Sequence, residues 1–284
     1  MVDAAASRNS RHPGQDKGRM MRLQERIAIV SGAAGGIGEG IAKAYAAEGA
    51  TVLACDLNED GAAETAEAIN KNGGIASSCH IDITEAEAVQ AMIAKYASKH
   101  GKLDIIANVA GTGQRHSFLE AKAEEFDRVM KVNLMGTFIC GQAAAREMVK
   151  QHYGRIINIA SIAGTRAGSG RTAYGTSKSA VIGLTRQAAL ELAPHGVTVN
   201  AVAPGPVDTP LTRVTHNDVT REGYKQLIPV GRYGMVEEIA DAAVFLAGEQ
   251  ASYVNGHILY VDGGYISAGI STDFGGTIDP STKK

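Results

Sequence analysis

The chain has 284 residues, of which 44% are hydrophobic and 20% charged, and its formal net charge at pH 7 is −2. These values are typical of a soluble globular protein that can bury one large core. They exclude the charge bias of a protein that binds nucleic acid or a membrane surface, so we expect neither as a partner.

The two ends of the chain differ in composition from its body. Residues 1–22 lack an apolar run long enough for a secretory signal, so we interpret them as a flexible N-terminal extension. Met20 or Met21 is an alternative start, and a tag-like tail or a transit peptide are further readings. Residues 23–265 contain no repeat and no linker, which predicts one catalytic domain. Residues 266–284 are rich in Gly, Ser and Thr and are interpreted as a C-terminal tail, placed at a subunit interface.

Apolar, strand-like runs alternate with helical stretches through the body. A helix is expected over residues 37–48, directly after the first strand. The alternation predicts an α/β protein with a doubly wound parallel sheet of about seven strands and helices on both faces. The expected strands are residues 26–30, 51–56, 76–82, 103–109, 155–160, 197–203 and 258–261.

A glycine-rich turn, from Ser31 to Gly38, links the first strand to the first helix. Backbone amides and a helix N-terminus at such a turn face a pyrophosphate. The glycines Gly32, Gly36 and Gly38 do not have the G-x-G-x-x-G spacing of the general dinucleotide motif. The alternative is that they only close a tight turn.

Tyr174 and Lys178 lie one helical turn apart, thirteen residues after the hydroxyl of Ser161. A free tyrosine has a pKa of about 10, and lowering it to about 7 requires about 4 kcal/mol of phenolate stabilisation. A nearby ammonium and an oxidised nicotinamide supply such stabilisation, while Ser161 holds the substrate oxygen. Among the nine tyrosines, Tyr174 alone has a lysine four residues later. The alternative is a solvated helix face.

The choice of cofactor depends on Asp56, which ends the second predicted strand. An acid at this position accepts hydrogen bonds from the adenosine ribose hydroxyls. A 2′-phosphate near the same carboxylate costs on the order of 4 kcal/mol per unit charge at about 4 Å. Neither the glycine turn nor Leu57 provides a compensating base, so we predict NAD rather than NADP. The alternative role for Asp56 is to cap the next helix.

With these features in order, residues 23 to about 265 resemble the short-chain dehydrogenase/reductase (SDR) family, whose domain has a Rossmann-like fold. Ser31 replaces the threonine of the family's glycine turn, and Val109 replaces the second asparagine of its N-N-A-G segment. The resemblance implies Asn133, Ser161, Tyr174 and Lys178 as catalytic residues, hydride transfer to or from NAD, and a homotetramer. It implies as cofactor-binding residues Gly32, Gly36, Ile37, Gly38, Asp56, Asp82, Ile83, Asn108, Ala110, Gly111, Tyr174, Lys178, Pro204, Gly205, Val207 and Thr209.

Cationic side chains near the expected nicotinamide position indicate the substrate. They are Arg115, His116, Arg166, Arg171 and Arg213, with His216, Asn217 and Arg221 further along a lid-like segment. If two or more converge, the pocket suits a carboxylate, a sulfonate or a polyhydroxylated sugar. We therefore expect a polar secondary alcohol and its carbonyl form, such as a sugar, polyol or hydroxy acid. The alternative is that these side chains point to solvent.

Two other functions stay open at this point. One is a 3-oxoacyl reductase or another ketone reductase of the same family, against which Asp56 argues through its effect on cofactor choice. The other is a non-catalytic NAD-binding sensor.

The three cysteines, Cys55, Cys79 and Cys140, have no metal-ligand spacing, which predicts buried reduced thiols, no metal site and a cytoplasmic location.

Overall fold

Parallel strands form a single sheet in the computed structural model, which describes residues 21–113 and 115–269. Their order is β3-β2-β1-β4-β5-β6-β7, so the winding direction reverses between β1 and β4. In such a sheet the ligand crevice lies outside the carboxyl ends of the strands at this reversal. The predicted doubly wound α/β fold is confirmed. The strands are β1 (Ile27–Ser31), β2 (Thr51–Asp56), β3 (Ile75–His80), β4 (Ile105–Asn108), β5 (Gly154–Ile159), β6 (Val197–Pro204) and β7 (Ile258–Val261).

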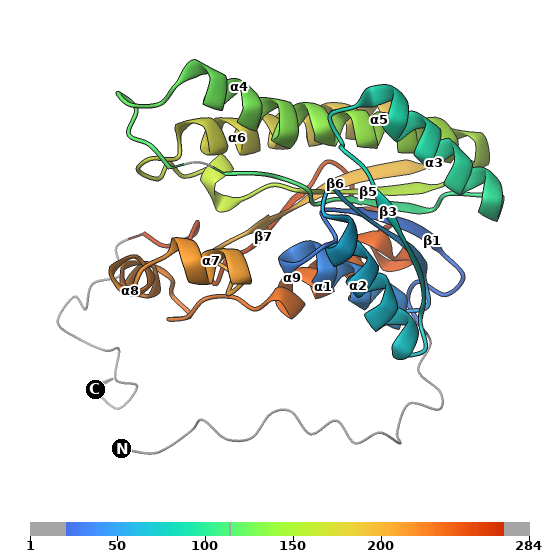
Figure 1. The fold of residues 1–284 in the computed structure, drawn as a ribbon, viewed down its shortest axis with the longest axis horizontal. Coiled ribbons are helices and arrows are strands. Elements are labelled where there is room, and N and C mark those ends of the chain that lie inside the picture. Colours follow the sequence, from blue (N-terminus) through green and yellow to red (C-terminus); the bar gives the residue numbers. More distant parts are fainter. Residues whose placement is uncertain (1–20, 114, 270–284) are drawn as a thin grey trace, which may run out of the picture.

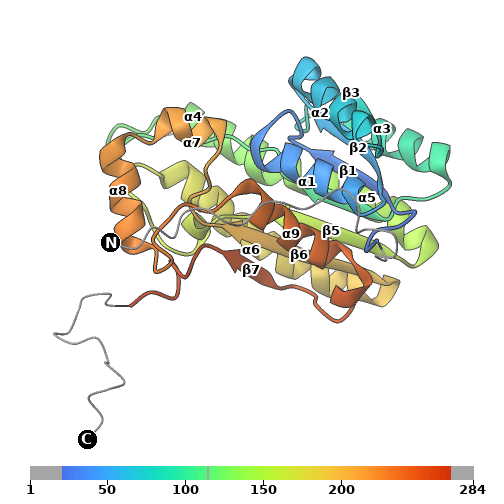
Figure 2. The ribbon, with the colours of Figure 1, turned by 90° about the horizontal axis from the view of Figure 1, so that it is seen from below.

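Helices cover both faces of the sheet (Figure 1). The longer helices are α1 (Gly36–Ala47), α2 (Glu59–Lys71), α3 (Ala86–His100), α4 (Ala123–Met130), α5 (Thr137–Met148), α6 (Thr172–Leu192), α7 (Pro210–Thr215), α8 (Asp218–Leu227) and α9 (Val236–Ala247). The short turns are η1 (Lys131–Gly136), η2 (Val149–Gln151), η3 (Ile162–Gly164), η4 (Ala193–His195) and η5 (Glu249–Ala251). Helices α1, α2 and α9 lie on one face and α3, α5 and α6 on the other, while α7 and α8 stand together at one end (Figures 1 and 2).

The central strands are mostly apolar because helices cover both of their faces. All five residues of β1 are buried. Ile41 and Tyr45 of α1 pack with Ile239 of α9 against one face, and Ile93 of α3 packs with Met148 of α5 against the other. This two-sided core fixes the carboxyl ends of the strands, where the chemistry-bearing side chains lie.

The observed bounds of β3 correct the predicted strand 76–82. The strand begins at Ile75 and ends at His80, so Asp82 belongs to the following turn, where its Oδ1 accepts a hydrogen bond from the backbone N–H of Thr84 at 2.8 Å. Because β3 is the edge strand, Cys79 is only partly buried, whereas Cys55 and Cys140 are buried as predicted. All three cysteines are free thiols.

Residues 1–20 and 270–284 are outside the described residues, so the predicted N-terminal extension and C-terminal tail stay predictions for most of their length. Within the described part, Leu23 is already fully buried against the α1 layer. No helix among the described residues is long and apolar enough to span a bilayer.

Candidate active site

The glycine turn lies against the loop that follows β4 and is itself tightly folded, and these two close approaches require glycine at two positions. Gly32 has φ +70°, and a Cβ there would lie 2.6 Å from the backbone nitrogen of Ala110. A Cβ on Gly38 would overlap the carbonyl group of Gly32. The hydroxyl of Ser31 also joins the two segments by accepting a hydrogen bond from the N–H of Val109 at 3.1 Å.

The other side of the turn is open. A Cβ on Gly35, at the N-cap of α1, would meet no atom within 4 Å. A Cβ on Gly36 would lie 3.7 Å from Cγ2 of Thr209, which begins α7. The N-terminus of α1 therefore faces free space that is bordered by Thr209, an arrangement that fits a pyrophosphate.

Alanine at Gly38 and at Gly35 is expected to have different effects. The Gly38→Ala side chain collides with backbone atoms of Gly32, so the free energy of unfolding should fall by roughly 1–3 kcal/mol. Gly35→Ala meets open space, so its stability should stay within about 0.5 kcal/mol of the parent while NADH binding weakens. Urea unfolding and NADH fluorescence titration measure the two effects. Equal destabilisation of both variants would contradict this description of the turn.

Asp56 points toward the glycine turn from the end of β2. Its Oδ2 accepts from the N–H of Ala34 at 3.0 Å and its Oδ1 from the N–H of Asn58 at 2.9 Å. A carboxylate has about four acceptor positions, so two remain for ribose hydroxyls. The N-cap of α2 is Asn58, whose side chain accepts a hydrogen bond from the N–H of Gly61. Asn58, and not Asp56, therefore caps this helix.

Asp82 and Ile83 lie just after β3, the edge strand next to β2. Hydrogen bonds from Thr84 hold the pKa of Asp82 below its ordinary value. Ile83 is buried, and Gly136 accommodates it because a Cβ there would overlap the isoleucine side chain. Asp82 is thus a fixed, ionised acceptor, which fits an adenine edge.

The side chain of Asn108, a predicted cofactor-binding residue, lies in the interior. It is 3% exposed and donates to Oδ1 of Asn158 at 2.9 Å, and Asn158 donates in turn to Thr185 of α6. This contact ties β4 to β5 directly before Ala110 and Gly111, and the role of Asn108 toward the cofactor stays a prediction.

Tyr174 and Lys178 lie on the same face of α6, as predicted, with the lysine Nζ 5.8 Å from the centre of the phenol ring. The ammonium donates to the carbonyl oxygen of Ile159 at 2.6 Å, and burial lowers the pKa of Lys178 to about 8. No hydrogen bond joins Lys178 to Tyr174 in the described structure. The expected ammonium–phenol pairing is therefore replaced by an ammonium fixed on the end of β5.

Burial raises the pKa of Tyr174, while a hydrogen bond with Ser161 and the positive charge of Arg171 act in the opposite direction. Ser161 caps the turn η3, where its Oγ accepts from the N–H of Ala163 at 3.1 Å. Ser161 is 8% exposed. The hydroxyls of Ser161 and Tyr174 therefore have fixed positions at the carboxyl end of β5, as the sequence predicts.

Asn133 is fully buried in the π-helical turn η1, a kind of helix defect that is frequent at functional sites. Its amide binds both backbone groups of Thr112, accepting at 2.7 Å and donating at 2.9 Å. It also donates to Ser177 of α6 at 2.9 Å, and Ser177 donates to the carbonyl of Tyr174. Asn133 thus fixes the loop after Gly111 relative to the catalytic helix.

Pro204, Gly205, Val207 and Thr209 form the edge of the cleft after β6. Gly205 is required because a Cβ would lie 2.8 Å from Cα of Asp262. Val207 and Thr209 are buried, and Thr212 closes the turn by donating to the carbonyl of Val207 at 2.7 Å. The Thr209 side chain therefore has a defined position between the glycine turn and α7.

The predicted substrate residues divide into two groups. Arg115 and Arg171 line one open cavity of about 250 Å³ with His216, whereas His116 pairs with Glu125 at 3.7 Å beside a different, smaller pocket. Arg213 is paired with Asp208 at 3.2 Å, and Arg166 donates to the carbonyl of Tyr265 at 3.1 Å. Gln114, which precedes Arg115, is outside the described residues.

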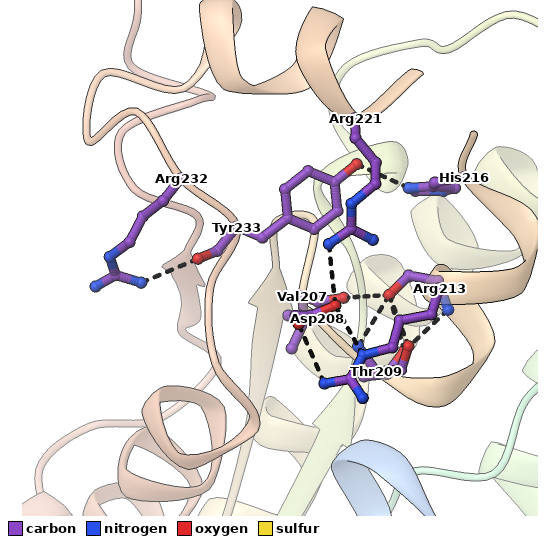
Figure 3. A network of polar contacts seen from close by, with 9 residues as sticks. Val207, Asp208, Thr209, Arg213, His216, Arg221, Arg232 and Tyr233 are labelled. Carbon is purple, nitrogen blue, oxygen red and sulfur yellow. Dashed lines mark hydrogen bonds and ion pairs between the residues drawn. The ribbon is translucent and has the colours of Figure 1, made fainter. Parts of the chain in front are cut away.

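A network of polar contacts holds the lid-like segment in place (Figure 3). Arg213 and Arg221 both point toward Asp208, and His216 Nδ1 lies 2.9 Å from the hydroxyl of Tyr233. Sequence reasoning missed the tyrosines of this region because tyrosine is common in cores and no spacing distinguishes them. Within residues 21–113 and 115–269, no cluster of His, Cys, Asp or Glu is placed to hold a metal ion.

Comparisons with known proteins agree with this geometry. A family model described as enoyl-(acyl carrier protein) reductase matches residues 32–266. The chain is 38% identical to the 3-oxoacyl-(acyl-carrier-protein) reductase FabG of Aquifex aeolicus over 245 residues, which are 86% of this chain and 98% of that protein.

Two solved structures of similar fold contain nicotinamide cofactors. A gluconate 5-dehydrogenase from Burkholderia cenocepacia, in complex with NADP and tartrate, has a TM-score of 0.84 at 34% identity, over 88% of this chain and 98% of its own. A 7α-hydroxysteroid dehydrogenase, complexed with NADH and 7-oxo glycochenodeoxycholic acid, has a TM-score of 0.83 at 36% identity, over 86% of this chain and 96% of its own.

Proposed function

Because the chain belongs to the short-chain dehydrogenase/reductase family, we propose that it is an NAD-dependent oxidoreductase that interconverts a polar secondary alcohol and its carbonyl compound. The observation that carries this proposal is the position of Tyr174, Ser161 and Lys178 at the carboxyl end of β5. The glycine turn follows β1 and Asp56 ends β2, so they lie at the carboxyl end of the same parallel sheet.

In the proposed mechanism the Tyr174 hydroxyl takes the alcohol proton in oxidation and returns it in reduction. Ser161 donates a hydrogen bond to the substrate oxygen as charge develops on it. Bound NAD supplies the acceptor for the hydride at its nicotinamide ring. Lys178 and Asn133 are both buried and fix the catalytic helix and the Gly111 loop, which would hold the nicotinamide. Thr209 would bind its carboxamide.

The preference for NAD is supported by the orientation of Asp56, since its two free acceptor positions suit ribose hydroxyls and disfavour a 2′-phosphate. Asp56→Asn is expected to reduce the ratio of kcat/KM for NAD over NADP by roughly 10- to 100-fold, because the amide removes the charge and half of the acceptors. Steady-state kinetics with each cofactor measure this ratio.

Asp82→Asn is the matched control, since the adenine is common to both cofactors. It should change the two kcat/KM values in parallel and leave their ratio constant. A parent enzyme that prefers NADP, or an Asp56→Asn variant with an unchanged ratio, would contradict the assignment.

The polar substrate is supported by the two guanidinium groups in the cavity beside Tyr174, and by the similar gluconate 5-dehydrogenase with bound tartrate. A panel of sugars, polyols and hydroxy acids with NAD, followed at the NADH absorbance band, tests it. The second candidate is a 3-oxoacyl reductase, which the identity to FabG favours. Faster reduction of a 3-oxoacyl thioester than of any polar ketone would establish that candidate instead.

We also infer a homotetramer in the cytoplasm. Met135 of η1 and Phe138 of α5 are 47% and 39% exposed, and Phe245 of α9 is 40% exposed, so both helical layers carry apolar surface suited to subunit contacts. The three free thiols suit a reducing compartment. Light scattering after size-exclusion chromatography measures the assembly, and a mass of one chain would contradict it.

A further inference from the structure

The cavity beside Tyr174 is lined by both aromatic rings and cationic groups. Its volume is about 250 Å³, and its lining includes Arg115, Arg171, His216, Tyr224 and Tyr265. The volume is below the usual range of roughly 300–1,000 Å³ for ligand pockets, so it suits a molecule of few carbons. The size and positive charge of the cavity therefore restrict which ligands can bind.

Arg115 and Arg171 are the arginines that line this cavity, and neither has an acidic partner among the described residues. Arg213 and Arg221 share Asp208, at 3.2 and 3.1 Å. Among the described residues, the Arg171 guanidinium makes one polar side-chain contact, to Nε2 of His216 at 3.4 Å, and the side chain of Arg115 packs over Gly170. Most of their ten N–H donors are therefore available to a ligand.

His216 does not neutralise these charges, and its protonation state can be deduced from its contacts. A guanidinium can only donate, so Nε2 of His216 accepts from Arg171 and Nδ1 carries the proton that is donated to Tyr233. Burial, followed by the charges of Arg171, Arg115 and Arg221, lowers the pKa of His216. Asp208 is the nearby acid, but it is already shared by Arg213 and Arg221. The imidazole is thus a neutral support that orients Arg171.

The position of Arg171 relates this charge to the catalytic hydroxyl. Arg171 is the N-cap of α6, three residues before Tyr174, and its Cζ lies 5.4 Å from the centre of the Tyr174 ring. An anion bound to Arg171 and a hydroxyl bound to Tyr174 are therefore close enough to belong to one small molecule. Arg115 reaches the same cavity from the loop after β4.

We propose that Arg171 and Arg115 bind the carboxylate of the substrate, so that the enzyme acts on a small hydroxy acid or sugar acid rather than on a neutral sugar or polyol. This inference rests on the proposed dehydrogenase function and names its substrate class. Arg171 supplies a planar pair of donors that matches a carboxylate, Arg115 adds a second charge, and the rings of Tyr224 and Tyr265 cover the carbon chain.

Binding of malonate tests the anion site without turnover, because malonate has no hydroxyl group to oxidise. Malonate should raise the melting temperature of the parent protein in a saturable manner. Its apparent affinity should fall roughly 10-fold or more in Arg171→Gln and in Arg115→Gln. Lys71→Gln removes one exposed positive charge from α2 and should bind malonate like the parent. Equal malonate affinity in all four proteins would overturn the proposal.

Turnover gives a second, independent test. For the best hydroxy acid of the panel, Arg171→Gln should lower kcat/KM roughly 10- to 100-fold, but for the matching carboxamide it should lower it less than about 3-fold. Arg171→Lys should recover part of the loss because it restores charge without the planar pair. An equal loss on acid and amide would overturn the carboxylate assignment. Arginine-dependent malonate binding in a protein that oxidises no alcohol would instead retain the anion site and refute the dehydrogenase function.

Discussion

Tyr174→Phe is expected to lower kcat by roughly 10²- to 10⁴-fold, the usual contribution of a positioned acid–base group. The change removes one oxygen and its hydrogen bond with Ser161 but keeps the ring that packs beside Arg171 and Lys178. The affinity for NADH should stay within about 3-fold of the parent, because Asp56 and the glycine turn are untouched. Stopped-flow turnover and NADH fluorescence titration measure the two effects.

Ser161→Ala is the informative companion variant. It removes the hydroxyl that fixes both the Tyr174 oxygen and the turn η3, so kcat should fall by roughly 10²- to 10³-fold.

If Tyr174→Phe retained both turnover and biological activity, the alternative of a non-catalytic NAD-binding sensor would replace the enzyme. A variant that lost NADH binding together with turnover would show that Tyr174 is chiefly structural.

Much of the fold follows from local sequence signals. The bounds of β2 and β7 are as predicted, since each is an apolar run that ends at a turn. Gly32 and Gly38 could be assigned to a crowded turn because only glycine tolerates such an approach. Tyr174 and Lys178 could be placed together because a helix puts residues four apart on one face, whereas Ser161, at the start of η3, was added through the family resemblance.

Side-chain positions are hardest to predict where the partners are distant in the sequence. The side chain of Asn108 is held in the interior by Asn158, which lies fifty residues later on the neighbouring strand. Arg213, within α7, and Arg171, at the N-cap of α6, were both predicted near the substrate, yet Asp208 pairs with Arg213 and not with Arg171. Charge at the sequence level therefore did not distinguish a structural ion pair from a ligand-binding group.

Lys178→Met is expected to lower activity and to stabilise the folded protein at neutral pH. The ammonium is 5% exposed, and burial lowers the pKa of Lys178 from 10.5 to about 8, so holding its charge below pH 8 costs about 3 kcal/mol. Loss of the hydrogen bond to Ile159 offsets part of the gain. We expect a net increase of about 1–2 kcal/mol in the free energy of unfolding at pH 7, with kcat/KM reduced roughly 10²-fold or more.

The sign of the pH dependence separates this prediction from a simple packing effect. Between about pH 8 and 10.5 the unfolded chain keeps the lysine proton and the folded chain releases it, so the stability contributed by Lys178 rises with pH across this window. Lys178→Met lacks this rise. Urea unfolding at pH 7 and pH 9.5 should therefore show the advantage of the variant shrinking as pH increases. A variant less stable than the parent at pH 7, with the same pH dependence, would mean that Lys178 carries no buried charge. Lys178 would then not be the source of a positive charge near the Tyr174 ring.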